Sequence, residues 1–401
     1  MTTLDTRAVR AGLAQDTQFG AVVPPLHLSS NFTFAGFDQP RQYDYTRSGN
    51  PTRDALADAL AQMENGAGAT VTASGMGAIT LVCQLLRPGD LLLAPHDCYG
   101  GTYRLFNTLA ERGAFDVQFV QQNDEAQWSA ALARHPRLVW IETPSNPLLR
   151  LVDIEKAAAD AHAVGALVAV DNTFLSPALQ TPLDLGADIV AHSTTKYLNG
   201  HSDVVGGAVV AAEESLHEEL AGWANCLGLS GAPFDSFLTL RGVRTLGARL
   251  RVHEENAASV ARTLQQHPLV RAVHYPGLTD HPDHALACRQ QRGFGGMVSV
   301  EIDGGLARVQ SFVEGLQHFF LAESLGGVES LVCHPATMTH KPMTQDARDT
   351  AGICDGLVRL SVGIESEADL CADLVRALDG AASIDESQAA FTQLPRVAAA
   401  L

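Results

Sequence analysis

Short apolar runs alternate with amphipathic stretches from about residue 53 onward. Five runs are typical of buried strands, because each is nearly continuous in apolar residues and ends near polar or turn residues: 91–94, 117–120, 138–142, 167–171 and 189–192. Helices are expected between them at 99–112, 125–134 and 154–164. Asp153 is the expected N-cap of the last helix and Gly165 its end. This alternation predicts an α/β fold with a mostly parallel sheet covered by helices on both faces.

The pattern changes after about residue 250 and indicates a smaller α+β domain at 251–401. Helices are expected at 257–266, 306–316 and 367–378, and strands at 297–302 and 357–362. Residues 382–401 are expected to form a loosely attached tail. The larger domain would span 56–250. Residues 1–55 show little periodicity, so we expect this N-terminal arm to be ordered by a neighbouring subunit.

Composition narrows the function classes. The 401 residues favour two or three domains, and the net charge of −18 argues against nucleic-acid binding through phosphate neutralisation. No run approaches the roughly 20 apolar residues of a membrane helix, and the first residues lack a secretory pattern. The seven cysteines contain no C-x-x-C pair, which favours reduced thiols and a cytoplasmic location. His96-Asp97-Cys98 matches no zinc spacing, so no metal is expected.

Lys196 stands in the most informative local segment, Ser193-Thr194-Thr195-Lys196-Tyr197, directly after the apolar run 189–192. Lysine is rarely buried, and it becomes a nucleophile when desolvation or nearby cations destabilise its ammonium. The hydroxyls of Ser193 and Thr195 could bind a phosphate beside it. The structural alternative is a surface lysine after a strand.

Asp171 ends the apolar run 167–171, at the edge of the sheet where ligands bind in such folds. A carboxylate there fits an acid paired with the ring nitrogen of pyridoxal 5'-phosphate (PLP), because a protonated pyridine draws electrons from a substrate carbanion. The structural alternative is an N-cap for the following segment.

Three further features are compatible with a PLP site. Ser74-Gly75-Met76-Gly77-Ala78 precedes an apolar helix, and small residues at a helix start let backbone N–H groups approach a phosphate. Tyr99 opens a helix after a strand and could stack on a flat ring. Arg359 shares one face of its strand with Ser361 and needs an acceptor, either a substrate carboxylate or a structural Asp or Glu. The structural alternative for the segment 74–78 is a tight turn, and for Tyr99 it is a tyrosine packed in a core turn.

Longer stretches carry a resemblance to a known family. They are VVPPLHLSSNFTF, YDYTRSGNPTR, APHDCYGGTYRLF, ETPSNPLLRLVDI, VDNTFLSPALQ, HSTTKYLNGHSDVVGG and LAESLGGVESL. Over about residues 5–380 the chain resembles the Cys/Met-metabolism family of PLP enzymes, and within it the bacterial gamma-synthase branch. The resemblance implies the fold-type-I aminotransferase architecture, PLP as cofactor, and a homotetramer of two dimers with shared active sites.

The resemblance also implies roles for individual residues. Lys196 would be the Schiff-base lysine and proton shuttle, Asp171 would pair with the pyridine nitrogen, and Tyr99 would stack on the ring. The phosphate would be held by Gly75, Met76, Ser193 and Thr195, and by Tyr45 and Arg47 of a neighbouring subunit. The substrate carboxylate would be clamped by Arg359 with Asn146 and Ser324. The specificity residues would be Glu323, Asp44 and Arg104.

The activity implied by the resemblance is γ-replacement in methionine biosynthesis and transsulfuration. O-succinyl-L-homoserine, or the O-acetyl ester, and L-cysteine would form L-cystathionine. Tyr99 is expected to act as a phenolate that deprotonates the incoming amine, because adjacent cations would lower its pKa. Ser48 departs from the synthase pattern, since some bacterial synthases carry a second arginine there. Its segment also matches gamma-lyases, which leaves cystathionine cleavage to cysteine, 2-oxobutyrate and ammonia as the alternative.

Two other function classes fit the sequence less well. An NAD-dependent oxidoreductase would share a parallel sheet, but the G-x-G at Gly75 lacks the third glycine and the early placement of a dinucleotide fingerprint. A non-catalytic PLP-binding protein is disfavoured by the complete set of catalytic residue types.

Overall fold

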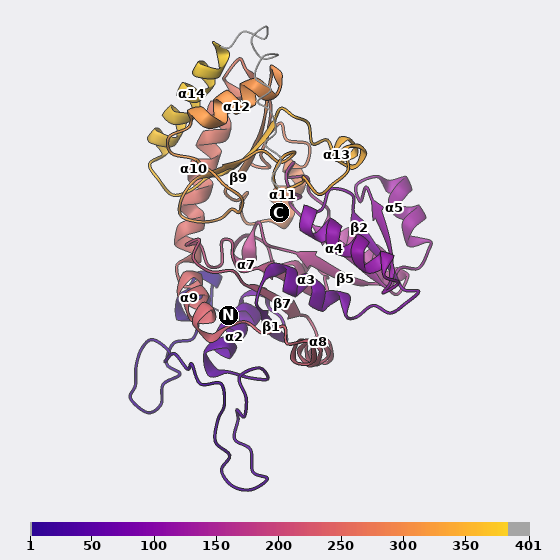
Figure 1. The fold of residues 1–401 in the computed structure, drawn as a ribbon, viewed down its shortest axis with the longest axis vertical. Helices are drawn as coiled ribbons and strands as arrows, with labels where there is room; N and C mark the ends of the chain where they lie inside the picture. Colours follow the sequence, from indigo (N-terminus) through magenta and orange to yellow (C-terminus); the bar gives the residue numbers. More distant parts are fainter. Residues whose placement is uncertain (1, 384–401) are drawn as a thin grey trace, which may run out of the picture.

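Two sheets organise the computed structural model, which describes residues 2–383 (Figure 1). The larger sheet has the strand order β1-β7-β6-β5-β4-β2-β3. Its strands are β1 (Gly68–Thr72), β2 (Leu91–Pro95), β3 (Asp116–Val120), β4 (Leu138–Glu142), β5 (Leu167–Asp171), β6 (Ile189–Ser193) and β7 (Gly207–Ala211). All neighbours pair in parallel except β7, which is antiparallel to both β1 and β6. The expected mostly parallel α/β sheet is confirmed.

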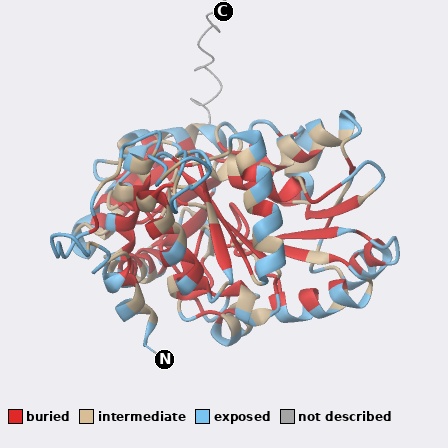
Figure 2. Cartoon of the chain, turned by 90° about the horizontal axis from the view of Figure 1, so that it is seen from below, coloured by how far each residue is buried: buried red, intermediate tan, exposed pale blue. Residues whose placement is uncertain are grey.

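Helices cover both faces of this sheet. They are α2 (Pro51–Glu64), α3 (Gly75–Cys83), α4 (Gly100–Glu111), α5 (Glu125–Leu132), α6 (Ile154–Ala163), α7 (Ser176–Leu179), the 3-10 helix η1 (Pro182–Leu185), α8 (Glu214–Leu227) and α9 (Pro233–Val243). Because side chains alternate along a strand, Leu92 packs in one core with α3, α4 and α8, while Leu91 and Leu93 pack in another with α5 and α6. Figure 2 shows the buried strands between helices whose outer surfaces are exposed.

The second sheet has the order β10-β11-β12-β9-β8. Its strands are β8 (Val270–His274), β9 (Met297–Ile302), β10 (Phe320–Leu321), β11 (Leu331–Cys333) and β12 (Leu357–Ser361). The helices of this part of the chain are α10 (Leu246–Gln265), α11 (His284–Gln290), α12 (Gly305–Gly315), α13 (Gln345–Ala351) and α14 (Glu367–Ala382). The expected helix at 257–266 is the second half of α10, so the predicted domain boundary at residue 250 falls inside a helix. Most of the predicted tail, 384–401, lies outside the described residues.

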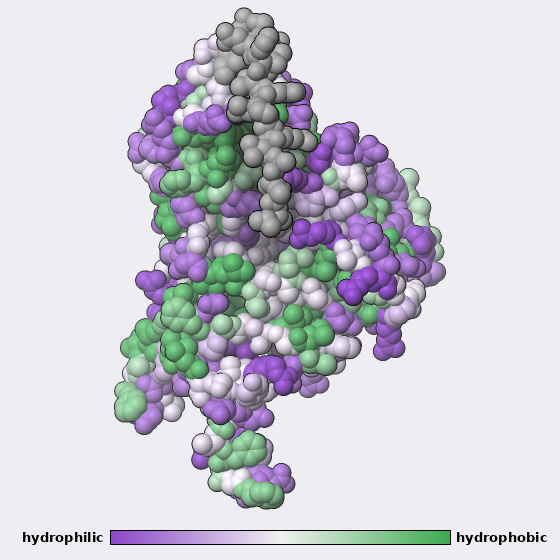
Figure 3. Space-filling model, viewed as in Figure 1, coloured by the Kyte–Doolittle hydropathy of each residue, from purple (hydrophilic) through white to green (hydrophobic). Residues whose placement is uncertain are grey.

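The N-terminal arm is only partly irregular. Helix α1 (Leu4–Arg10) contacts α2 and α10 and buries Ala8 in the main core. Between α1 and α2 the chain forms no helix and only isolated bridges. This stretch extends away from the body at the bottom of Figure 1, and Figure 3 shows hydrophobic side chains on it. Phe19 and Phe37 are 83% and 99% exposed, so apolar surface here is left uncovered by the chain itself.

Candidate active site

A cavity of about 370 Å³ lies where the carboxyl ends of β4, β5 and β6 meet residues of the second sheet. Ligands bind at this edge in parallel α/β sheets. The predicted site residues that line it are Gly75, Met76, Tyr99, Asn146, Asp171, Ser193, Thr195, Lys196, Glu323, Ser324 and Arg359. The fold therefore gathers into one cavity residues that are up to 284 positions apart, the separation of Gly75 and Arg359.

Lys196 stands in the turn that follows β6. Its Nζ donates a hydrogen bond to Ser324 Oγ at 2.6 Å. Burial, followed by the positive charge of Arg359, lowers the pKa of Lys196 to about 8. The amine is therefore partly neutral near physiological pH, as a nucleophile or proton acceptor must be. The surface-lysine alternative is wrong.

Asp171 is the last residue of β5, in register with Glu142 on β4 and Ala191 on β6. Its Oδ1 accepts a hydrogen bond from the Thr173 N–H at 3.0 Å. Burial raises the pKa of Asp171, while Thr173 and the charge of His192 oppose this. A buried carboxyl at the cavity wall fits a cationic ring N–H, because that partner would compensate its desolvation.

The start of α3 and the end of β6 meet at one wall of the cavity. Ser74 caps α3 by accepting a hydrogen bond from Gly77 N at 3.0 Å, which leaves Gly75 and Met76 in the first turn of the helix. A Cβ on Gly75 would lie 2.7 Å from Ser193 Cβ, so only glycine permits this approach. Helix N-terminal N–H groups next to a hydroxyl suit a phosphate. Thr195 lines the cavity, although its hydroxyl donates to Gly206 O at 3.2 Å.

Arg359 lies on β12 and is 2% exposed. Val358 and Leu360 belong to the core of the second sheet, so the predicted alternation along this strand is confirmed. The guanidinium donates to Asn146 Oδ1 and to the Ser324 carbonyl, both at 2.9 Å. Within residues 2–383 its Nε has no hydrogen-bond partner. The cation is thus held by neutral oxygens, which leaves its charge available for a substrate carboxylate.

Tyr99 is the N-cap residue of α4, and its backbone N–H donates to Glu142 Oε2 at 2.9 Å. The expectation that nearby cations lower its pKa is wrong for this chain. Burial, followed by the negative charge of Glu323, raises the pKa of Tyr99, and the opposing charges of Arg104 and Arg359 do not outweigh them. Burial and Glu323 therefore favour the neutral phenol over the phenolate in the single chain.

Four predicted residues do not line the cavity: Asp44, Tyr45, Arg47 and Arg104. Arg47 reaches α8 instead, where its NH1 donates to the carbonyl and side-chain oxygens of Asn225 at 2.5 and 2.7 Å. The Arg47 guanidinium also lies 5.8 Å from the Tyr45 ring centroid. Asp44 accepts hydrogen bonds from Tyr45 N and Ser48 Oγ at 2.6 and 3.2 Å. The first three of these residues stay in the arm, away from their own chain's cavity.

Sequence reasoning missed several cavity residues. Glu142 ends β4 beside Asp171, and burial raises its pKa well above the usual value. Thr173 accepts a hydrogen bond from Ser193 N at 2.9 Å and so joins the ends of β5 and β6. His192 and Thr339 also line the cavity. The positions of Glu142 and His192 at the ends of expected strands were the available signal.

No helix within residues 2–383 combines the length and hydrophobicity needed to cross a bilayer. Over the same residues, no three His, Cys, Asp or Glu side chains are grouped so as to hold a metal ion.

The fold and the cavity define an enzyme of the PLP-dependent class, because a lysine of lowered pKa, a buried carboxyl and a helix N-terminus line one cavity at the edge of a parallel sheet. The chain belongs to the Cys/Met metabolism PLP-dependent enzyme family, whose model matches residues 5–379. Its cofactor is therefore pyridoxal phosphate.

Comparisons with individual relatives give the degree of similarity within this family. The chain is 57% identical to cystathionine gamma-synthase of Escherichia coli over 92% of its own length and 96% of that protein. It is 46% identical to cystathionine beta-lyase of Coxiella burnetii, with coverages of 94% and 97%. A crystal structure of cystathionine gamma-synthase from Xanthomonas oryzae pv. oryzae in complex with cystathionine is 61% identical, with a TM-score of 0.95 over 96% of this chain and 99% of that one.

Proposed function

We propose that this chain catalyses γ-replacement, forming L-cystathionine from L-cysteine and O-succinyl-L-homoserine or its O-acetyl analogue. The observation that carries this proposal is the 61% identity and TM-score of 0.95 to a synthase solved with cystathionine. In the balanced reaction the Cγ–O bond of the ester breaks and a Cγ–S bond forms. The acid leaves as its carboxylate, and the thiol proton passes to solvent.

The cavity residues support this chemistry. Bound PLP supplies an electron sink for negative charge that develops at the substrate Cα. Arg359 binds the α-carboxylate through its unpartnered Nε and its fork of N–H donors. Asp171 holds the proton of the ring nitrogen. Gly75, Met76 and Ser193 hold the phosphate and thereby fix the orientation of the ring.

Lys196 is the residue that moves protons at the substrate carbons. With a pKa of about 8, roughly one tenth of the free amine is neutral at pH 7, against about one part in 3,000 for an ordinary lysine. The Ser324 hydroxyl, 2.6 Å from Nζ, orients this amine. We assign Tyr99 to stacking on the ring, and its raised pKa favours the neutral phenol.

Substrate specificity depends on the residues next to those that hold PLP and the α-carboxylate. A synthase must stabilise an anionic acyl group and then admit cysteine, which carries a second carboxylate. Arg104 supplies a positive charge next to Tyr99, and Glu323 supplies a negative charge that lines the cavity. This combination supports binding of zwitterionic cysteine opposite the homoserine ester.

The alternative function is cystathionine gamma-lyase. Ser48 favours it, because this position carries no second cation for the acyl or cysteine carboxylate. The 44% identity to a cystathionine gamma-lyase of Dictyostelium discoideum shows that related chains are named for this cleavage. The Cα chemistry is common to synthase and lyase, so the cofactor residues do not separate them.

We further propose a cytoplasmic homotetramer in which Tyr45 and Arg47 complete the phosphate site of a neighbouring subunit. Exposed apolar residues on the arm, including Phe19 and Phe37, support burial against a second copy of the chain. All seven cysteines are free, which supports a reducing compartment.

A product assay tests the proposal. The purified enzyme is incubated with O-succinyl- or O-acetylhomoserine, with and without cysteine, and separately with cystathionine alone. Cystathionine synthesis is expected to be faster than cystathionine cleavage at saturating substrate, with slow 2-oxobutyrate formation from the ester when cysteine is left out. If cleavage is the faster reaction, the lyase function replaces the synthase.

A further inference from the structure

The pairing between β4 and β5 ends at the cavity. Its last pair is Glu142 and Asp171, and both residues line the cavity. Thr143 and Asn172 each lie one position further along, where the two chains leave the sheet. Asn172 N still donates to Ala191 O of β6 at 3.0 Å, but on the β4 side the strand pairing has stopped. Side chains must therefore fix the end of β5 relative to the chain after β4.

Two buried amide side chains make this connection. Gln180 is the C-cap residue of α7 and is 0% exposed. Its Nε2 donates to Thr143 O and to Asn172 Oδ1, both at 3.1 Å. Asn172, which is also 0% exposed, donates in return from Nδ2 to Gln180 O at 2.9 Å. The Gln180 amide thus joins the residue after β4 to the residue after β5.

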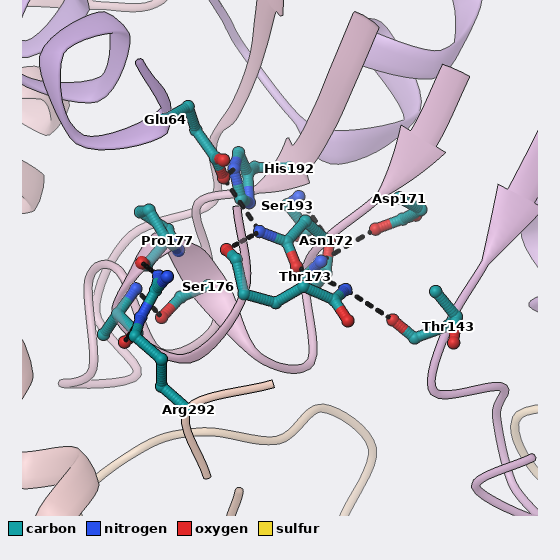
Figure 4. A network of polar contacts seen from close by, with 12 residues as sticks. Glu64, Thr143, Asp171, Asn172, Thr173, Ser176, Pro177, His192, Ser193 and Arg292 are labelled. Atoms are coloured by element: carbon teal, nitrogen blue, oxygen red, sulfur yellow. Dashed lines mark hydrogen bonds and ion pairs between the residues drawn. The ribbon is translucent and has the colours of Figure 1, made fainter. Parts of the chain in front are cut away.

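A further contact anchors this amide pair to α2. Asn172 Nδ2 also donates to Oε1 of Glu64, the last residue of that helix, at 2.8 Å. Figure 4 shows Asn172 in the middle of the network and turned toward Glu64. A carboxyl oxygen accepts a hydrogen bond whether or not the group is ionised, so the contact does not depend on the charge of Glu64. Both amides have one possible orientation, because the carbonyl oxygens that they face can only accept.

The amide pair does not line the cavity. Asp171 and Thr173 are part of the cavity wall, whereas Asn172 between them is not, and neither is Gln180. The two amides can therefore influence a bound cofactor only through the residues that they hold in place. Because both are fully buried, leaving their donors unpaired is costly, and this restricts the network to one geometry.

We propose that Gln180 is a positioning residue of the PLP site: together with Asn172 it ties the end of β5 to the chain after β4, and so holds Asp171 in place for the ring nitrogen of the cofactor. The inference rests on the family's cofactor and on the proposed role of Asp171. It is independent of whether the enzyme is a synthase or a lyase.

The test is a double-mutant cycle of Gln180→Met and Asp171→Asn. Methionine has nearly the volume of glutamine but no N–H donor, so the substitution removes both hydrogen bonds with little change in packing. Each PLP-loaded enzyme is dialysed against a series of PLP concentrations at fixed protein concentration. The bound fraction is read from the visible absorption band of the cofactor, and the dissociation constant follows from it.

Gln180→Met is expected to weaken PLP binding in the chain that keeps Asp171. A hydrogen bond to a charged group contributes about tenfold to a hundredfold in affinity, and a displaced Asp171 loses part of it, so we expect a dissociation constant about tenfold higher. In the Asp171→Asn background the same substitution should have no further effect, because the residue through which it acts is already removed. A merely structural role would weaken binding equally in both backgrounds.

Asn172→Leu provides a second test that does not depend on how well Gln180→Met folds. It removes the other half of the amide pair, so we expect similarly weakened PLP binding. Combining Asn172→Leu with Gln180→Met should weaken binding no further, because the two amides act as one unit.

Asn256→Leu is the matched control for the loss of a buried amide. Asn256 on α10 is 4% exposed, and its Nδ2 donates to Gly363 O and Glu365 O at 3.0 and 2.9 Å. Like Asn172, it therefore donates twice from a buried position, but it lies outside the cavity wall and is not in contact with the Gln180 amide. The substitution is expected to lower thermal stability and to leave the dissociation constant of PLP unchanged.

A folded Gln180→Met enzyme that binds PLP as the wild type does would overturn the proposal. So would a weakening that persists in the Asp171→Asn background, or an equal weakening in Asn256→Leu. If Asp171→Asn alone leaves PLP binding unchanged, the role of Asp171 is wrong and the proposal falls with it, and this single variant separates that failure from a failure of the amide pair. The dialysis needs no substrate, so a failed synthase assay leaves the result unaffected.

Discussion

Lys196 is expected to destabilise the cofactor-free chain at neutral pH, so replacing it with methionine should stabilise that form. Burial and the charge of Arg359 lower its pKa from 10.5 to about 8. The folded state therefore binds the proton of this ammonium more weakly than the unfolded state does. From these two values, the penalty is about 3 kcal/mol at pH 7 and about 1 kcal/mol at pH 9.5. The stability of the wild type relative to the variant thus rises as the pH increases from 8 to 10.5.

The hydrogen bond between Lys196 and Ser324 reduces the stabilisation that is expected from Lys196→Met. Its loss in Lys196→Met costs about 1 kcal/mol, because the Ser324 hydroxyl loses its 2.6 Å partner. The variant should therefore be about 2 kcal/mol more stable than the wild type at pH 7. Near pH 9.5 the two should be nearly equal.

Urea unfolding of both cofactor-free proteins at pH 7 and pH 9.5 measures this difference. Protein concentration must be held fixed, because assembly changes the apparent stability. Lys156→Met is the matched control, since Lys156 is a partly exposed lysine whose pKa is raised by Asp160 at 2.6 Å. It should show no stabilisation at either pH. A stability difference between wild type and Lys196→Met that is the same at both pH values would refute the assigned pKa and its cause.

Three further predictions concern the site. Lys196→Ala should bind PLP without the absorption band of the lysine-linked cofactor, and an unchanged spectrum before any amine is added would rule out the assignment. Arg47→Ala and Lys196→Ala should each be nearly inactive, and co-refolded mixtures should recover activity if sites are shared; demonstrably mixed oligomers with no recovery would count against this. Arg104→Ala should lower the rate of cystathionine synthesis about tenfold to a hundredfold, while Ser48→Arg should leave it unchanged or faster, as measured by initial rates.

Hydrophobic periodicity correctly located the strands whose buried residues follow one another along a single element. The strands at Leu138–Glu142, Leu167–Asp171 and Met297–Ile302 have the expected bounds. The N-cap at Asp153 is confirmed by its hydrogen bond from Lys156 N at 3.1 Å. These features are local, because a continuous apolar run or a capping side chain acts within a few residues.

Elements with weaker local patterns were missed. The strand Gly207–Ala211 is a short run of small and β-branched residues that begins at the second glycine of a pair, and it pairs antiparallel with strands on both sides. The helix Leu246–Gln265 begins 11 residues before its expected start, at 257, because its first turns are buried against other elements rather than marked by a cap. Tertiary packing determines whether such segments become helix or strand. A short window of sequence does not contain the long-range contacts on which this depends.

The sequence by itself determined the fold class, the family and the identities of eleven cavity residues, because these follow from strand–helix alternation and from long matching segments. Only the tertiary structure decided how those residues behave. Burial beside Arg359 lowers the pKa of Lys196, and burial beside Glu323 raises that of Tyr99, against expectation. The structure also revealed the hydrogen bond between Gln180 and Thr143, which are 37 residues apart. Desolvation and charge–charge distances set protonation, and both are properties of three-dimensional packing that a linear pattern does not contain.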